Sequence, residues 1–596
     1  MILKTFFLIT AAAALGLDTK EWTSPSAEVV AQVQAMETAL AAMAKGETPE
    51  VTVQQAIEKV RNLADKENDR DAQFAMGLLL QQSNQENSLP EALAYYQKSS
   101  EQGQLQAMNN YGFILAGSNQ DLEKTKGGIG FIKKAAEGGL NAARRNMAAI
   151  YVNGLAGEKK DPDAALKLLE TAAADGDHQA EFELAQFFLE SGGKERIDDD
   201  KAWDWLNKAA DAGNPNALAV LGSVLFDGKK FGARKIDADP TKAVATFTKL
   251  ADQGVPAGLR TMGELHVSGM AGVPKDFKKA LDYFTRAAEG SDAAAQVVLA
   301  GYYDQGVDID PNDGKVDVVP NPAAALELYR LAARNNVPLA LYQVGAFYEA
   351  GRSVDKDPQK AFIAYLQAAS GGFAPAMQKV GVYYLNGVGT LKDPVAAGGW
   401  FSRAAAAGSP EGLLSLGVMA ESGLLAVGAE STPAKAAAEA YTQVIQVPQV
   451  APQTRFEALV RLGGLHFRGA LVPAGEAPAP DFESAYRYFK QASKIAPTNE
   501  LVVTAIKEVS AKLTPEQIKK IDDSISETAA AASASGSAAP APASPPAAAT
   551  QASATEKPVK ATPTAEAPPA PEEAPAATKT EATEKKSGFR LPFLGR

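Results

Sequence analysis

Residues 256–290 read PAGLRTMGELHVSGMAGVPKDFKKALDYFTRAAEG and contain the signals of two consecutive helices. Apolar residues recur at helical spacing up to Gly269, a residue type that commonly follows the end of a helix. Asp276 is then placed to cap the start of a second helix. Gly263 is expected where the two helices cross, because a larger side chain would hold their backbones apart. The stretch therefore predicts a helical hairpin.

The same frame recurs along the whole chain. A small residue follows an apolar one at Gly77, Gly112, Ala148, Ala185, Gly222, Gly263, Ala300, Gly345, Gly381, Gly417 and Gly463, with spacings of 35 to 46 residues. A period of this length is typical of stacked helix pairs, which present a long surface rather than one buried pocket. We therefore predict an all-α fold, a right-handed α-solenoid of about eleven antiparallel helix-pair repeats, and a binding function.

Two units show the repeat most completely. One unit contains Ala376, Val380, Gly381, Tyr384, Gly387, Asp393, Trp400, Phe401, Ala404, Ala405 and Gly408. Another contains Ala340, Val344, Gly345, Tyr348, Gly351, Asp357, Lys360, Ala361, Tyr365, Ala368, Ala369 and Gly372. These residues resemble the Sel1-like repeat family, relatives of the tetratricopeptide repeats. The resemblance covers residues 71–497 and implies a solenoid whose first helices line the concave face.

Non-core positions on those first helices are the candidate protein-binding residues. They are Arg144, Arg145, Arg260, Glu264 and Gln378. Their mixed charges argue against one simple charged ligand and favour a peptide or protein partner. A solvated face would have the same composition.

The amino terminus has the features of an export signal. Lys4 precedes an apolar run from Thr5 to Leu17, and Ala11 to Ala14 supply small residues for cleavage. We predict that residues 1–17 form a signal peptide and that the protein is periplasmic or secreted. An uncleaved anchor is the alternative, but the run is shorter than the roughly 20 residues that span a bilayer.

Flanking helices are expected on both sides of the array. Residues 18–70 form a predicted N-terminal helical cap, with helices over 27–45 and 53–66. Residues 498–527 form predicted C-terminal capping helices, which include LTPEQIKKI at 513–521. Terminal caps of this kind cover the apolar ends of repeat stacks.

The remaining chain has a different composition. Residues 528–588 are rich in Ala and Pro and nearly free of large apolar side chains, which predicts a disordered linker. Residues 589–596 form a short apolar and basic motif with Phe589, Leu591, Phe593 and Leu594 as candidate docking residues. An inert tail is the alternative, because a few exposed apolar residues are ordinary.

Four units carry insertions outside their expected helices. They lie at residues 227–239, 305–321, 421–432 and 468–480. Solenoids accept such additions on one edge, where they serve as recognition loops or as tolerated surface length.

The sequence contains few patterns typical of catalytic or metal-binding sites. Residues 308–317 read DIDPNDGKVD but lack the late glutamate and the glycine position of a calcium-binding EF-hand loop. His266 and His466 occupy the aromatic position of the repeat, and His178 lies at a turn between units. The chain has no cysteine, no G-x-S-x-G and no phosphate-binding loop. We predict no catalytic residue, cofactor or metal, and a protein that is not an enzyme.

The positions of three tryptophans predict which of them are buried and which is exposed. Trp205 and Trp400 are expected in the seam between units, because they occupy the repeat's aromatic position. Trp203 lies two residues before Trp205 and is a candidate exposed contact, because a two-residue step changes the helix face.

Charge and composition narrow the function. The net charge of -12 is spread along the chain without a basic stripe, which disfavours nucleic acid as a partner. No integral membrane segment is expected after signal cleavage. The sequence favours a non-catalytic scaffold or adaptor of the bacterial cell envelope that binds one or more envelope proteins. The alternative is a component associated with peptidoglycan, or a regulator of an envelope enzyme.

Overall fold

The computed structural model describes residues 22, 25–45, 47–83, 88–117, 122–155, 157–308, 317–426, 431–473 and 476–535. Residues 1–17, residues 309–316 of the tested calcium loop, and the terminal motif with Phe589, Leu591, Phe593 and Leu594 lie outside the described residues. The chain divides into two compact units between Asp292 and Ala293.

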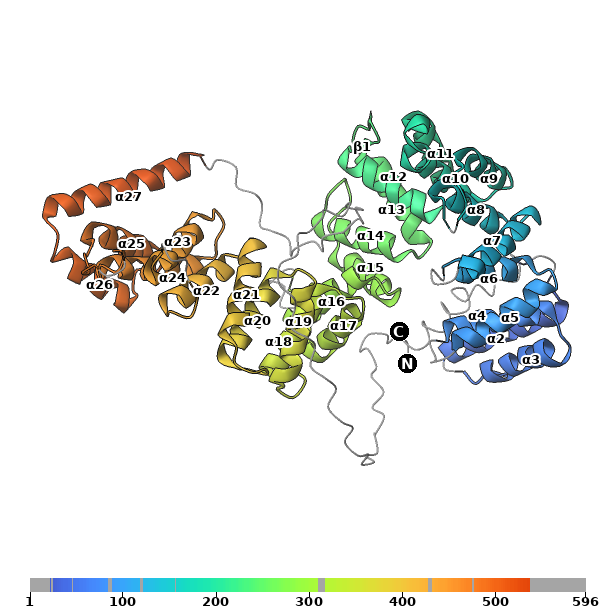
Figure 1. The fold of residues 1–596 in the computed structure, drawn as a ribbon, viewed down its shortest axis with the longest axis horizontal. Helices are drawn as coiled ribbons and strands as arrows, with labels where there is room; N and C mark the ends of the chain where they lie inside the picture. Colours follow the sequence, from blue (N-terminus) through green and yellow to red (C-terminus); the bar gives the residue numbers. More distant parts are fainter. Residues whose placement is uncertain are drawn as a thin grey trace, which may run out of the picture. The chain divides into compact units, whose positions relative to one another are not determined.

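The first unit is a stack of helix pairs (Figure 1). Its helices are α2 (Ala27–Lys45), α3 (Val53–Lys66), α4 (Arg70–Gln82), α5 (Ser88–Glu101), α6 (Leu105–Gly117), α7 (Leu122–Glu137), α8 (Asn141–Asn153), α9 (Pro162–Ala174), α10 (His178–Gln186), α11 (Asp199–Asp211), α12 (Pro215–Asp227), α13 (Pro240–Asp252), α14 (Pro256–Ser268) and α15 (Phe277–Glu289). A π-helix, η2 (Phe187–Ser191), and a 3-10 helix, η3 (Lys194–Arg196), follow α10. Strands β1 (Lys230–Phe231) and β2 (Arg234–Lys235) pair antiparallel.

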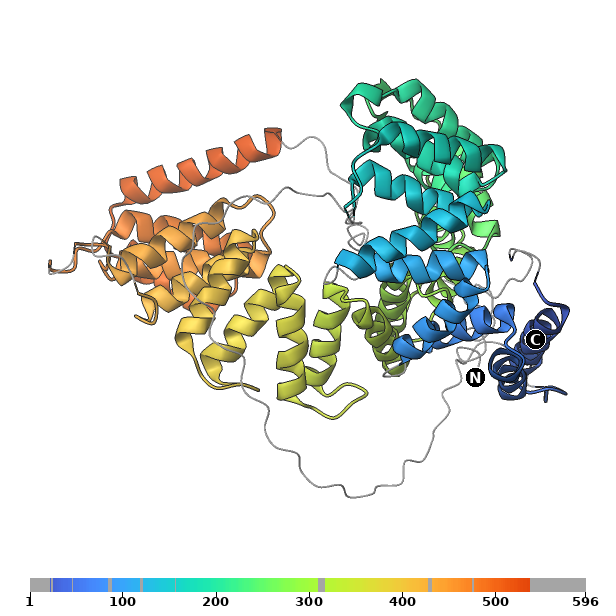
Figure 2. The same cartoon turned by 45° about the vertical axis from the view of Figure 1, so that its right-hand side comes forward.

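The second unit continues the same arrangement (Figure 2). Its helices are α16 (Ala293–Gln305), α17 (Pro322–Arg334), α18 (Pro338–Ala350), α19 (Pro358–Ser370), α20 (Ala374–Asn386), α21 (Pro394–Ala406), α22 (Pro410–Glu421), α23 (Pro433–Gln446), α24 (Pro452–Phe467), α25 (Phe482–Ile495), α26 (Glu500–Ser510) and α27 (Pro515–Ser535). Within both units, helices pack mainly on their neighbours in sequence. The helices from α4 to α25 make eleven pairs, so the predicted all-α solenoid is confirmed.

The second helix of many pairs begins at an Asp-Pro step. Asp357 Oδ1 accepts a hydrogen bond from the backbone N–H of Lys360 at 3.0 Å, and Asp393 Oδ1 accepts one from Ala396 at 2.9 Å. The following proline occupies the first helical turn, where an N–H has no helical partner. These contacts explain why the helix starts could be located from the sequence.

The glycines that recur once in most repeats, here called frame glycines, lie against aromatic rings of the second helix of the same pair. A Cβ atom built on Gly345 would lie 2.8 Å from the Tyr365 ring, and one on Gly381 would lie 2.5 Å from the Phe401 ring. Gly417 has the same relation to Tyr441, at 2.5 Å. The small residues are therefore contact points between crossing helices, as predicted.

The insertions lie between helices, and one contains the β1–β2 hairpin. Phe231 of this hairpin packs edge-on against Trp203, with ring centroids 5.4 Å apart. Trp203 is therefore half-buried, and the expectation of a free, exposed ring is wrong. The face of α11 that looks exposed from helical periodicity is covered by a segment about 30 residues away in sequence. Trp205 and Trp400 are also half-buried, each packed against an apolar core.

The ends of the described chain pack on the array. Helices α2 and α3 occupy the two expected ranges, and α3 packs on α4. Helix α27 packs on α25 through Ile521 and Ile525, and it continues to Ser535, eight residues beyond the expected boundary at 527. Alanines from 529 to 532 favour helix strongly, which explains the extension. Among the described helices, none is both long and apolar enough to span a bilayer.

Candidate protein-binding groove

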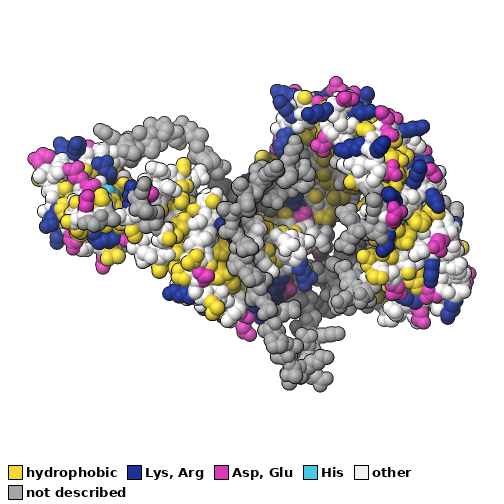
Figure 3. Space-filling view, viewed as in Figure 1, with side chains coloured by type: hydrophobic (Ala, Val, Ile, Leu, Met, Phe, Trp, Pro, Cys, Tyr) yellow, Lys and Arg dark blue, Asp and Glu magenta, His cyan; other side chains and the backbone are white. Residues whose placement is uncertain are grey.

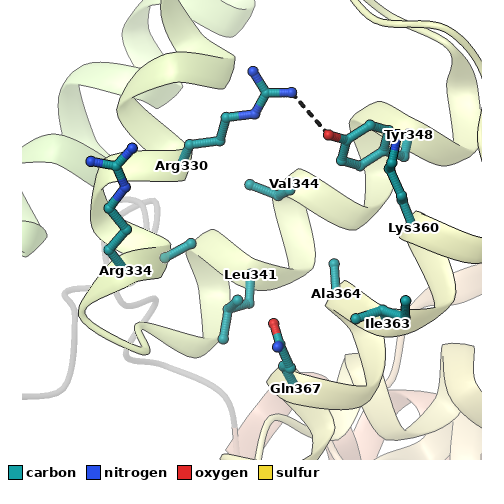
Figure 4. Close-up of a pocket in the computed structure, with 10 residues that line it drawn as sticks. Arg330, Arg334, Leu341, Val344, Tyr348, Lys360, Ile363, Ala364 and Gln367 are labelled. Carbon is teal, nitrogen blue, oxygen red and sulfur yellow. Dashed lines mark hydrogen bonds between the residues drawn. The ribbon is translucent and has the colours of Figure 1, made fainter. Parts of the chain in front are cut away.

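A groove of about 420 Å³ lies on the second unit between α17 and α19, over α18 (Figure 4). Its lining comes from three consecutive helices. The residues are Arg330, Ala333 and Arg334 of α17, Leu341, Val344 and Tyr348 of α18, and Lys360, Ile363, Ala364 and Gln367 of α19. The volume falls within the range of ordinary ligand pockets.

The floor of the groove is apolar because small and branched side chains meet there. Leu341 and Val344 are buried on α18, and Ala364 is buried on α19. Ala333 and Ala364 are short, so the flanking helices leave a hollow above α18 rather than filling it. Ile363 on the α19 side is 55% exposed and extends the apolar surface of the floor.

The rim of the groove is cationic. Arg330 Nη2 donates a hydrogen bond to the Tyr348 hydroxyl at 3.0 Å, and the Lys360 ammonium lies 5.5 Å from the Tyr348 ring centroid. Arg334 is exposed, and the described part of the chain offers its side chain no hydrogen bond or ion pair. The described lining residues include three cations and no carboxylate.

The Arg330 side chain stays positively charged because its pKa is raised. Burial lowers its pKa, but the hydrogen bonds to Tyr348 and Glu327 raise that pKa by more. The guanidinium therefore keeps its proton, with a pKa above the ordinary value. The groove can attract a carboxylate at any physiological pH.

A sequence model of the Sel1 repeat matches nine segments that cover more than half of the chain. The segments are residues 70–104, 141–177, 178–214, 215–255, 257–292, 293–337, 338–373, 374–409 and 456–494. The chain is a Sel1-repeat protein. The pairs α6/α7 and α22/α23 lie where this model does not match, yet they have the same helical-hairpin structure.

Known relatives agree with this family. The Sel1-repeat-containing protein YjcO of Escherichia coli K12 is 30% identical over 196 residues, which cover 32% of this chain and 77% of YjcO. Chitin synthase regulatory factor 3 of Schizosaccharomyces pombe is 25% identical over 39% of this chain and 20% of that protein. Sel1-repeat solenoids are typically non-catalytic scaffolds for protein–protein interaction.

A solved structure supports the fold. The crystal structure of c5321, a protective antigen present in uropathogenic Escherichia coli strains, has a TM-score of 0.52 to this Sel1-repeat protein. The two chains are 23% identical, and the match covers 82% of this chain and 99% of c5321.

The arginines predicted as binding residues join neighbouring repeats. Arg145 forms ion pairs with Asp177 at 3.0 Å, at the turn before the next repeat, and with Glu183 of that next repeat at 3.2 Å. Arg144 of the same helix pairs with Asp175. These contacts give the guanidinium groups a role in holding the α8–α10 junction of the Sel1-repeat array.

The other predicted array residues lie on α14 and α20. Arg260 pairs with Glu264 at 2.7 Å and with Asp292 at 3.3 Å, while Gln378 is half-buried on α20. None of the predicted array residues lines the groove. Their role in partner binding stays a prediction.

A carboxylate that the sequence analysis missed also connects two repeats. Glu349 at the end of α18 accepts hydrogen bonds from the Tyr365 hydroxyl at 2.7 Å and from Lys379 Nζ at 2.8 Å. Burial raises the pKa of Glu349, but Lys379 and Tyr365 lower it by more, so its pKa lies below the ordinary value.

The same arrangement recurs further along the array. Glu421 accepts hydrogen bonds from the Tyr441 hydroxyl at 2.8 Å and from Arg461 at 3.3 Å. Glu349 and Glu421 each lie four residues after a frame glycine, and each glycine packs on the ring of the donor tyrosine. An acid at this spacing, followed by a tyrosine on the second helix, is the signal that could have located both sites.

We expect Glu349→Gln to reduce stability at neutral pH by about 1 kcal/mol or less, because the ion pair with Lys379 is partly solvated. Because the pKa of Glu349 is lower in the folded state, ionised Glu349 stabilises the folded protein fully at pH values above its unfolded pKa of about 4.3. This contribution is lost as pH falls through the folded pKa. Urea midpoints of parent and variant should therefore converge as pH falls through the lowered folded pKa of Glu349. Glu439→Gln, at an exposed position on α23, is the control. A gap between parent and Glu349→Gln that persists at low pH would exclude ionisation as its cause.

Two of the histidines occupy packing positions, whereas His178 is the first residue of α10 and its Nδ1 lies 3.0 Å from Glu181 Oε2. His266 is buried and stacks on Tyr283 with ring centroids 5.7 Å apart, and its Nδ1 lies 3.1 Å from the Pro274 carbonyl. His466 packs at 5.4 Å from the Tyr488 ring. These contacts agree with the structural roles inferred from the sequence.

A second apolar surface lies at the start of α21. Leu391 and Val395 are 87% and 85% exposed, and Figure 3 shows hydrophobic side chains gathered over α20 and α21 on the face in view. This surface lacks the combination of hollow, apolar floor and cationic rim found between α17 and α19. The groove is therefore the stronger candidate site.

Proposed function

We propose that this protein is a non-catalytic scaffold of the bacterial cell envelope that binds one or more protein partners through its Sel1 repeats. The groove between α17 and α19 is the observation that carries the proposal, because it offers a partner both apolar contact and fixed charge. The apolar, small-residue start of the chain supports export to the periplasm or beyond the cell. The candidate docking motif at 589–596 provides a second point of attachment.

Crosslinked capture from envelope extract tests this function. The full chain is compared with a variant that ends at Ser535, so that helix α27 stays complete. Partners retained by the shorter variant place recognition on the array, and partners lost from it place recognition on the terminal segment. Capture of no specific protein by either form contradicts the scaffold function, and fractionation of the same cells checks the envelope location.

The second candidate is a component associated with peptidoglycan or a regulator of an envelope enzyme. The name of the Schizosaccharomyces pombe relative, chitin synthase regulatory factor 3, favours a link to polysaccharide synthesis, although that match covers 20% of the relative. Sedimentation with purified sacculi separates the two candidates. Association without added protein supports peptidoglycan binding, whereas a protein that stays in solution supports the scaffold.

A further inference from the structure

We propose that the groove between α17 and α19 binds an acidic segment of a partner protein in which large apolar side chains are flanked by carboxylates. This inference rests on the proposed scaffold function and names the chemistry that its groove selects. Its basis is the pairing of an apolar floor with cations at both ends of the groove (Figure 4).

The cations are placed to meet two separate acidic groups. Figure 4 shows Arg334 at one end of the groove and Lys360 with Tyr348 at the other. Arg330 and Lys360 already contact Glu327 at 2.6 Å and Asp357 at 3.2 Å, so part of their charge is balanced. Arg334 has no such balance within the described chain, so it is the strongest attractor for an incoming carboxylate. Its planar guanidinium also favours two-point binding of carboxylates.

The floor selects for an apolar side chain between those acidic groups. Leu341, Val344 and Ile363 offer only hydrocarbon, and Ile363 gains most from being covered because it is 55% exposed. A volume of about 420 Å³ accommodates a few anchoring side chains rather than a folded domain. Anchors that fill such pockets carry most of the energy of protein interfaces.

The same features disfavour other ligands. A glycan strand exposes hydroxyl and amide groups, yet the uncharged polar groups in the described lining are limited to Tyr348 and Gln367. A basic segment would be repelled by the three cations. A simple polyanion would gain charge contacts but would leave the apolar floor uncovered.

Fluorescence anisotropy with defined peptides tests the inference on the full chain. The probe is fluorescein-labelled Glu-Glu-Asp-Leu-Phe-Asp-Glu, compared with a peptide in which Leu and Phe are Ser and another in which every acid is Lys. Arg334→Glu and Ile363→Asp change exposed side chains and should each weaken probe binding about tenfold. Lys392→Glu changes an exposed lysine away from the groove and should leave binding unchanged. Circular dichroism checks that the variants keep their helix content.

The outcomes separate this inference from the proposed function. Preference for the acidic and apolar peptide, with loss in both groove variants, supports the inference. Equal binding of the three peptides, no binding of any, or no effect of Arg334→Glu overturns it. If Arg334→Glu and Ile363→Asp still capture the same envelope proteins as the parent chain, the scaffold function stands and only the groove assignment fails. If the parent chain captures nothing, the scaffold function itself fails.

Discussion

Replacement of Gly381 by alanine should destabilise the protein by about 1–3 kcal/mol, the usual cost of overpacking a core. The new Cβ would lie 2.5 Å and 2.7 Å from two atoms of the Phe401 ring. Phe401 is only 1% exposed, so its ring cannot move aside without disturbing the core between α20 and α21. Alanine also favours helix over glycine by roughly 0.5–1 kcal/mol, which offsets part of the cost. The shift in urea midpoint, followed by circular dichroism, measures the net effect.

The matched control is Gly399→Ala in the paired helix α21. A Cβ at this exposed position would meet no atom within 4 Å, so only the gain in helix propensity remains. The control should therefore raise the midpoint slightly while Gly381→Ala lowers it. Shifts of equal sign and size would show that contact with Phe401 is not what requires glycine at position 381.

The sequence predicted the helix pairs well because many helix boundaries have a local cause. Thr52 forms a capping box with Gln55 at the start of α3, and Asp276 caps α15. The period also located the two pairs that the family model does not match. In one of these pairs, α6 and α7 also meet at small residues, which keeps the period. A Cβ atom added to Gly112 would lie 2.5 Å from the carbonyl oxygen of Gly128.

The groove could not be predicted in the same way. Its cations lie on different helices and come together only when α17, α18 and α19 pack. The hollow depends on two short side chains, Ala333 and Ala364. Alanine recurs at the position of Ala333 in many repeats, whereas most repeats have a larger residue at the position of Ala364, such as Tyr283 or Trp400. The pattern of small residues at the helix crossings does not reveal the groove, and the signal that could have located it is alanine at 364, where most repeats have a larger side chain.

The predicted binding arginines show the opposite limitation. Arg145 and Arg260 each pair with an aspartate 32 residues later, at the turn before the next repeat. The position of these two arginines on the first helix of a pair correctly indicated that their side chains are partly exposed. It did not show that each guanidinium forms an ion pair within the array. A search for complementary charges one repeat apart would have revealed both junctions.

Tyr365→Ala should be among the most damaging single changes, with an expected cost of about 3–5 kcal/mol, as for other large aromatic truncations. The ring is 0% exposed, lies under Gly345, and has neighbouring rings at 5.2 Å in Tyr342 and 5.6 Å in Tyr383.

Tyr365→Phe separates the ring from the hydroxyl. Burial and the nearby Glu349 raise the pKa of Tyr365, so its hydroxyl stays protonated and donates to Glu349. Removal of that donor should cost about 1–2 kcal/mol, because Lys379 still satisfies the carboxylate. Urea unfolding of the parent and both variants measures the two contributions. If Tyr365→Phe costs as much as Tyr365→Ala, the hydrogen bond to Glu349 rather than ring packing holds this junction. A small cost for both would show that the seam repacks around the lost ring, contrary to the tight contact with Gly345.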